Sequence, residues 1–160
     1  MILNLLILGM LLIPNENKYD ELFQKYAGNI DWLLLKAQVK QESRFNPKAV
    51  SKAGAKGLAQ FMPATWNEWG KGDVFNPEAS ISAQARYMAW LIKYYKGDIN
   101  KALAGYNYGL GNVNKKLNIE PDFSKALLLM PKETQHYVKV INQYYNEYLA
   151  KQKKNPIHVD

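Results

Sequence analysis

The sequence contains no cysteine and only two histidines among its 160 residues. The absence of cysteine excludes disulfide bonds and thiolate metal sites. It leaves the compartment open, because many exported proteins lack disulfides. His136 and His158 lie far apart in the chain, so a histidine-based metal centre is not expected. We therefore predict a protein that uses neither a metal nor a cofactor.

The chain also lacks an internal repeat, a domain linker and a hydrophobic run long enough to span a bilayer comfortably. Its one strongly apolar stretch is residues 1–13. The length of that stretch fits the hydrophobic region of a signal peptide, but no basic residue precedes it and no small-x-small cleavage site follows. Three interpretations stay open: an export signal, a membrane or partner anchor, and an apolar arm packed on the domain. Export or anchoring is favoured.

The composition is 48% hydrophobic and 22% charged, which is typical of one globular domain with a real core. The formal charge of +7 favours a polyanionic partner such as nucleic acid, anionic lipid or an acidic cell envelope. The basic residues are scattered and no nucleic-acid motif is present, so nucleic-acid binding is not expected. We expect a monomer.

Helix-start and helix-stop residues divide the chain into a mainly α-helical domain over residues 18–150, preceded by the apolar segment 1–17 and followed by a basic tail over 151–160. No strand pattern of any length appears. We expect a loop over 46–57, a turn at Gly109 and Gly111, and a short apolar segment over 124–130. The longest helix is expected to open at Pro77. The predicted helices span residues 19–27, 31–43, 63–69, 77–96, 98–106 and 131–151.

The second of these helices carries a candidate acid at its end. Asp31 is a plausible N-cap, and Leu35, Val39 and Glu42 share one face of the helix. Glu42 should therefore lie at the rim of the core, where contact with apolar surface raises the pKa of a carboxyl group. A glutamate that stays protonated near neutral pH can act as a general acid. The alternative is a helix-end glutamate in solvent, and this stretch alone favours the alternative.

Four short motifs in fixed order resemble the catalytic domain of the soluble lytic transglycosylases, the goose-lysozyme-like enzymes of peptidoglycan. The resemblance covers about residues 19–149, and four motifs in order are far more specific than any one of them. It implies a lysozyme-like helical fold with little or no β-structure. The motifs are Gln41-Glu42-Ser43, Gly57-Leu58-Ala59-Gln60, Ala104-Gly105-Tyr106-Asn107-Tyr108-Gly109 and Pro131-Lys132-Glu133-Thr134-Gln135-His136-Tyr137.

The resemblance also implies roles by position. Glu42 matches the catalytic acid and base, and Ser43 matches a residue that orients it or the substrate. Glu133 matches a second, buried acidic residue. Ala59 stands where the family usually has methionine, so that wall of the site is expected to be more open. The residues implied to bind substrate or shape the site are Ser43, Gln60, Tyr106, Asn107, Glu133 and Tyr137.

Each of these side chains has an ordinary structural alternative. Ser43 fits a helix-terminal hydrogen bond, and Gln60 fits a bridge between backbone groups of its own loop. Tyr106 fits helix-end core, Asn107 a helix C-cap, and Glu133 a charge at the start of a helix. Only the joint pattern favours function.

The reaction implied by the resemblance is cleavage of the β-1,4 bond between MurNAc and GlcNAc with formation of 1,6-anhydro-MurNAc. A hydrolytic muramidase on the same fold is the alternative, since a fold does not fix the product. The expected partner is the peptidoglycan glycan strand, with possible membrane or envelope association through residues 1–13. The implied location is the periplasm or cell envelope, or a virion if the chain is phage-encoded.

Overall fold

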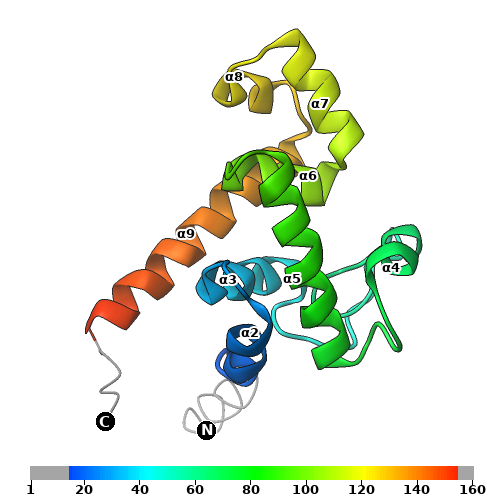
Figure 1. The fold of residues 1–160 in the computed structure, drawn as a ribbon, viewed down its shortest axis with the longest axis vertical. Coiled ribbons are helices and arrows are strands. Elements are labelled where there is room, and N and C mark those ends of the chain that lie inside the picture. The colour runs from blue at the N-terminus through cyan, green and yellow to red at the C-terminus, as the bar shows by residue number, and fades with distance from the viewer. Residues whose placement is uncertain (1–14, 155–160) are drawn as a thin grey trace, which may run out of the picture.

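The computed structural model describes residues 15–154 (Figure 1). The apolar stretch 1–13 and the end of the predicted basic tail lie outside the described residues. Within residues 15–154, no helix is both long enough and apolar enough to cross a membrane.

The described chain is helical and contains no β-strand, which confirms the predicted fold class (Figure 1). Sheet-like pairing within residues 15–154 consists of two isolated bridges, one from Lys56 to Val50 inside the predicted loop and one from Lys56 to Phe61 just after it. The helices are α2 (Asp20–Tyr26), α3 (Trp32–Ser43), α4 (Pro63–Trp69), α5 (Pro77–Tyr94), α6 (Ile99–Tyr108), α7 (Leu110–Ile119), α8 (Phe123–Leu128) and α9 (Lys132–Lys154).

Side-chain caps fix the starts of three helices at the predicted residues. The carboxylate of Asp31 accepts a hydrogen bond of 3.0 Å from the backbone N–H of Leu33 at the start of α3. Asn76 and Asp98 cap α5 and α6 in the same way. Each cap satisfies one of the N–H groups that a helix leaves without an intrahelical partner.

Two predictions about the helices were wrong. The segment after Gly109 is helix α7 rather than a longer turn, because the reversal is confined to Gly109, whose φ of +87° glycine tolerates. The apolar segment 124–130, for which no conformation was predicted, is largely helix α8, which Asp122 caps. The longest helix is α9 with 23 residues, not α5 with 18.

The predicted basic tail also begins too early. Residues 151–154 continue α9, and three lysines stand in its last turn. Positive charge at a helix C-terminus interacts favourably with the helix dipole. This explains why a run of lysines can extend the helix here.

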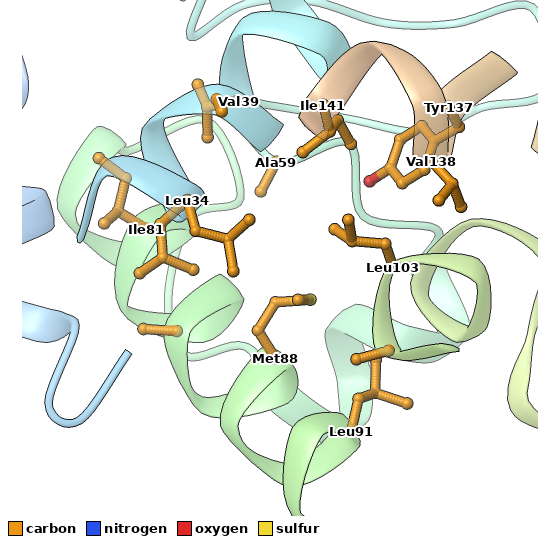
Figure 2. Packing of buried hydrophobic residues seen from close by; sticks show 14 of the residues in the cluster. Leu34, Val39, Ala59, Ile81, Met88, Leu91, Leu103, Tyr137, Val138 and Ile141 are labelled. Carbon is orange, nitrogen blue, oxygen red and sulfur yellow. The ribbon is translucent and has the colours of Figure 1, made fainter. Parts of the chain in front are cut away.

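The core gathers around α3, which packs on α9, while α6 packs on α5, α7 and α9. Leu34, Met88, Leu103 and Ile141 converge from four helices and are almost completely buried (Figure 2). This packing brings the end of α3, the end of α6 and the start of α9 close to one another. Tyr106 and Tyr137, from the third and fourth motifs, therefore lie close to Glu42.

Candidate active site

Glu42 lies in the last turn of α3, where the chain leaves the helix abruptly. Arg44 and Phe45 both take positive φ values, 50° and 62°, and Phe45 turns back into the core with 6% of its surface exposed. Left-handed backbone ends the helix within two residues of the glutamate. The Glu42 side chain is consequently partly exposed at the helix end, with buried Val39 one turn behind it.

Burial raises the pKa of Glu42 from 4.5 to about 8. A hydrogen bond from Tyr137 opposes this rise, and the negative charge of Glu133 adds to it. The predicted elevation of the Glu42 pKa is thus confirmed, and its main cause is the one that was expected, loss of water around the charged form. Near neutral pH the carboxyl group is mostly protonated.

A directed chain of hydrogen bonds holds one oxygen of Glu42. The Tyr137 hydroxyl donates to Glu42 Oε1 at 2.6 Å, and Gln38 Nε2 donates to the same hydroxyl at 2.9 Å. Gln84 Nε2 donates to Gln38 Oε1 at 2.8 Å and to the backbone carbonyl of Leu35 at 3.0 Å. Because the amide group of Gln38 is oriented by Gln84, its N–H faces Tyr137 and leaves the tyrosine proton for Glu42.

The sequence did not point to Gln38 or Gln84 as residues near the site. The structure shows that both are fully buried. Gln38 precedes Glu42 by four residues and so shares its helix face, a signal that the sequence does carry. Gln84 lies among the apolar inner residues of α5, and a polar side chain at such a position usually has a specific partner. Which partner it has depends on tertiary packing.

Tyr106 approaches the site from the end of α6. Its hydroxyl donates to the backbone carbonyl of Ala59 at 2.9 Å, and the Ala59 N–H donates to the hydroxyl of buried Ser80 at 3.2 Å. Burial, together with the charge of Glu42, holds the pKa of Tyr106 well above its usual value. Ala59 is completely buried, and the expectation that the smaller side chain leaves this wall of the site more open stays a prediction.

Gln60 and Ser43 bond within their own segments. Gln60 Nε2 donates to the carbonyls of Gly57 and Ala49 at 2.9 and 3.2 Å, the loop bridge that was the structural alternative. The Ser43 hydroxyl donates to the carbonyl of Val39 at 3.3 Å, one turn back along α3. Their contribution to substrate binding remains a prediction.

Asn107 and Glu133 form a second polar contact, in addition to the hydrogen bond between Tyr137 and Glu42. The Thr134 hydroxyl donates to Asn107 Oδ1 at 2.8 Å, and Asn107 Nδ2 reaches Glu133 Oε1 at 3.5 Å. The prediction that Glu133 is buried was wrong: it is exposed, and its neighbour Thr134 takes the buried position in the first turn of α9. Asn107 lies inside α6, whose C-cap is Gly109, so it is not a C-cap either.

The packing therefore joins Glu42 to Tyr137 and Asn107 to Glu133, with Tyr106 and Glu133 close enough for charge interaction with Glu42. Among residues 15–154 no group of three or more His, Asp or Glu side chains could hold a metal ion. A groove of about 720 Å³ lies elsewhere, between α2, α5 and α9, and includes none of the site residues.

Comparison with solved structures places the fold in the lysozyme-like helical class of the lytic transglycosylases. The chain matches the 70 kDa soluble lytic transglycosylase from Escherichia coli with a TM-score of 0.74 and 27% identity, over 83% of this chain and 25% of that one. The same enzyme in complex with bulgecin A gives a TM-score of 0.76 and 28% identity, over 86% and 25%.

The chain belongs to the transglycosylase SLT domain family, whose model matches residues 21–129. A membrane-bound lytic murein transglycosylase F from Alteromonas mediterranea is 40% identical over 102 residues, which are 60% of this chain and 22% of that protein. A protein of the same name from Pasteurella multocida is 34% identical over 160 residues, covering 81% and 32%. The chain thus spans between a fifth and a third of the length of these relatives.

Proposed function

We propose that this protein is a peptidoglycan lytic transglycosylase in which Glu42 acts first as the acid and then as the base. The observation that carries the proposal is half-buried Glu42 at the end of α3, whose carboxyl pKa burial raises to about 8, inside a domain of the SLT family. Relatives named as lytic murein transglycosylases support peptidoglycan as the substrate and the cell envelope as the location.

In the first step Glu42 protonates the glycosidic oxygen that leaves C1 of MurNAc. Tyr137 occupies Oε1 as a hydrogen-bond donor, so the acidic proton of Glu42 resides on Oε2, the oxygen that no protein donor holds within the described residues. The carbonyl oxygen of the substrate's own N-acetyl group attacks C1. The glycosidic bond breaks and an oxazolinium ion forms.

In the second step the Glu42 carboxylate accepts the proton of the C6 hydroxyl. That oxygen bonds to C1, the N-acetyl oxygen leaves, and 1,6-anhydro-MurNAc results without water. Retaining and inverting glycosidases ordinarily use two carboxylates. Glu133, whose charge acts on Glu42, is exposed and lies beside Asn107, so a mechanism with one protein acid fits the arrangement better.

Ser43, Gln60, Tyr106 and Asn107 then bind the substrate or shape its site. The Tyr106 hydroxyl donates a hydrogen bond to the Ala59 carbonyl and thereby supports the 57–60 loop. The amide oxygen of Asn107 accepts a hydrogen bond from the Thr134 hydroxyl. Both arrangements fix these side chains before substrate arrives, which reduces the ordering required for binding.

Digestion of purified peptidoglycan in ¹⁸O-labelled water, followed by mass spectrometry, tests this function. We expect unlabelled 1,6-anhydro ends from the wild-type protein and no products from Glu42→Gln, because an amide cannot donate the catalytic proton. Reducing ends carrying ¹⁸O as the main product would contradict the proposal and indicate a hydrolytic muramidase.

A further inference from the structure

The start of the described chain lies against the last turns of the final helix. The Tyr148 hydroxyl on α9 donates to Glu16 Oε2 at 3.1 Å, and Lys151 lines the same pocket as Glu16 and Asn17. Figure 1 shows α2 and the end of α9 at the end of the molecule opposite α7 and α8. The point at which residues 1–14 join the domain is therefore next to the end of α9.

Two lysines of α3 hold this junction in place. Lys40 Nζ lies 2.9 Å from Glu16 Oε1. Lys36 Nζ donates to Asn17 Oδ1 at 2.8 Å and to Asp20 Oδ2 at 3.0 Å. Lys36 is only 3% exposed, and a lysine is almost never buried so fully unless it is paired. These contacts fix the junction on α3 and occupy both of its acidic side chains.

Exposed positive charge surrounds the junction. Three lysines stand in the last turn of α9, a fourth follows Asn17, and all four are exposed. Within residues 15–154 no carboxylate forms a salt bridge with any of them. Two exposed acids, Glu21 and Glu147, offset part of their charge and leave an excess of positive charge. The lysine cluster consists of Lys18, Lys151, Lys153 and Lys154.

We propose that the lysine cluster and the apolar stretch 1–13 together form a surface that binds a bilayer of anionic lipid. Leucine, isoleucine and methionine make up all of residues 1–13 except Asn4 and Gly9. A stretch of this length is too short to span a bilayer comfortably. A single short apolar element binds membranes only marginally, so stable binding needs a second signal such as a basic patch. The lysine cluster supplies that signal next to the place where the apolar stretch begins.

The combination of apolar and basic elements favours a lipid surface over a soluble polyanion or an acidic wall polymer. A polyanion would interact with the lysines alone and would leave the apolar stretch in water, which is unfavourable. A bilayer of anionic lipid accommodates both elements. The apolar side chains enter the acyl region, and the lysine ammonium groups meet the negative headgroups at the surface.

This surface lies away from the candidate active site, so the inference does not rest on the proposed function. From Tyr137, the hydrogen-bond partner of Glu42, to Lys151 the helix α9 rises by about 20 Å. A bilayer at the end of α9 therefore leaves Glu42 accessible. Substitutions in the lysine cluster should change membrane binding and leave the turnover of soluble peptidoglycan fragments unchanged.

Co-sedimentation of the full-length protein with lipid vesicles tests the proposal. The vesicles contain phosphatidylglycerol and phosphatidylcholine in equal parts, or phosphatidylcholine alone. Combined Lys151→Gln, Lys153→Gln and Lys154→Gln should lower the partition coefficient onto the anionic vesicles roughly a hundredfold, which is about fivefold for each lysine. The same variant should bind the neutral vesicles as wild type does. Circular dichroism of each variant verifies that the fold is retained.

The matched control removes the same charge from the opposite end of the molecule. Combined Lys115→Gln, Lys116→Gln and Lys125→Gln on α7 and α8 should retain most of the binding to anionic vesicles (Figure 1). Equal affinity of wild type and the α9 variant, or an equal loss in this control, would overturn the proposal, because net charge alone would then explain any binding.

Two further measurements address the apolar stretch and the source of the negative charge. Combined Leu5→Ser and Leu8→Ser should weaken binding to both kinds of vesicle, and unchanged binding would contradict a role for residues 1–13. Lipid-free wall sacculi are the second probe. If the α9 variant lost affinity for sacculi while its vesicle binding stayed unchanged, the lysine cluster would bind an acidic wall polymer, and the proposal would be wrong.

Discussion

Replacing Glu42 with glutamine should make the protein more stable at alkaline pH, besides abolishing activity. Burial raises the pKa of Glu42 from 4.5 to about 8, so between these values the folded protein binds one proton more than the unfolded chain. The free energy of unfolding then falls as pH rises, because stability decreases wherever the native state binds more protons. The loss begins above pH 4.5 and is complete above about pH 8.

The magnitude follows from the width of that pH interval. One pKa unit corresponds to about 1.4 kcal/mol, so the stability difference between Glu42→Gln and wild type should grow by about 1.4 kcal/mol per pH unit within the interval. The upper limit of the difference is about 5 kcal/mol. Below pH 4.5 both side chains are neutral and the two proteins should unfold at similar denaturant concentrations.

Urea unfolding monitored by circular dichroism at a series of pH values measures this directly. Glu147→Gln removes an exposed glutamate of α9 and serves as the control, because it should leave the pH dependence of wild type in place. Parallel stability curves for wild type and Glu42→Gln from pH 5 to 8 would refute the reasoning, since they would mean that Glu42 is already ionised in the folded protein at pH 5.

Three further variants probe the surroundings of the site. Tyr137→Phe removes the donor that lowers the Glu42 pKa, so the alkaline limb of the kcat/KM profile should move up by about one pH unit; an unmoved limb would contradict this. Thr134→Val frees the Asn107 amide and should cost about 1 kcal/mol in urea unfolding, whereas an unchanged midpoint would show the bond to be dispensable. Gly57→Ala should lower Tm by several degrees, because φ is +79° and a Cβ would lie 2.3 Å from a backbone oxygen; a Tm equal to that of wild type would refute the close approach.

Local signals in the sequence were enough to predict most helix starts. Asp31, Asn76 and Asp98 cap helices where the residue types indicated, because an N-cap depends on atoms only two or three residues away. The same local reasoning failed after Gly109. At Gly109 the sequence does not distinguish a glycine that reverses the chain over one residue from a glycine that begins a longer turn.

The site was predictable in part, for a related reason. Glu42 and Tyr137 became candidates through the joint pattern of four motifs, and the structure joins them by a hydrogen bond. The exposure of Glu133 could not be predicted, since Glu133 and Thr134 are adjacent in α9 and packing against α6 decides which of them is buried. The contact between Gln84 and Gln38 spans 46 positions of sequence and exists only once α5 packs on α3.

The buried glutamine pair yields a last prediction, which separates fold from function. An amide pair in a helical core is not required for packing, and apolar side chains of similar size often stabilise such a position equally well. Gln84 even leaves its Oε1 without a hydrogen-bond partner within residues 15–154. If the pair serves the fold, Gln38→Leu should lower Tm and leave the activity of the remaining folded protein unchanged.

If the pair positions Tyr137, as the directed hydrogen bonds indicate, Gln38→Leu should act on the chemical step. The Tyr137 hydroxyl would lose its donor and turn away from Glu42 in part of the molecules, so kcat should fall about tenfold while KM stays the same. The alkaline limb of the pH profile should also move upward, as in Tyr137→Phe. Gln38→Glu, which keeps size and polarity but changes the donor, should not restore wild-type behaviour. An unchanged kcat and pH profile in a well-folded Gln38→Leu protein would show that the hydrogen bonds from Gln84 to Gln38 and from Gln38 to Tyr137 do not influence Glu42.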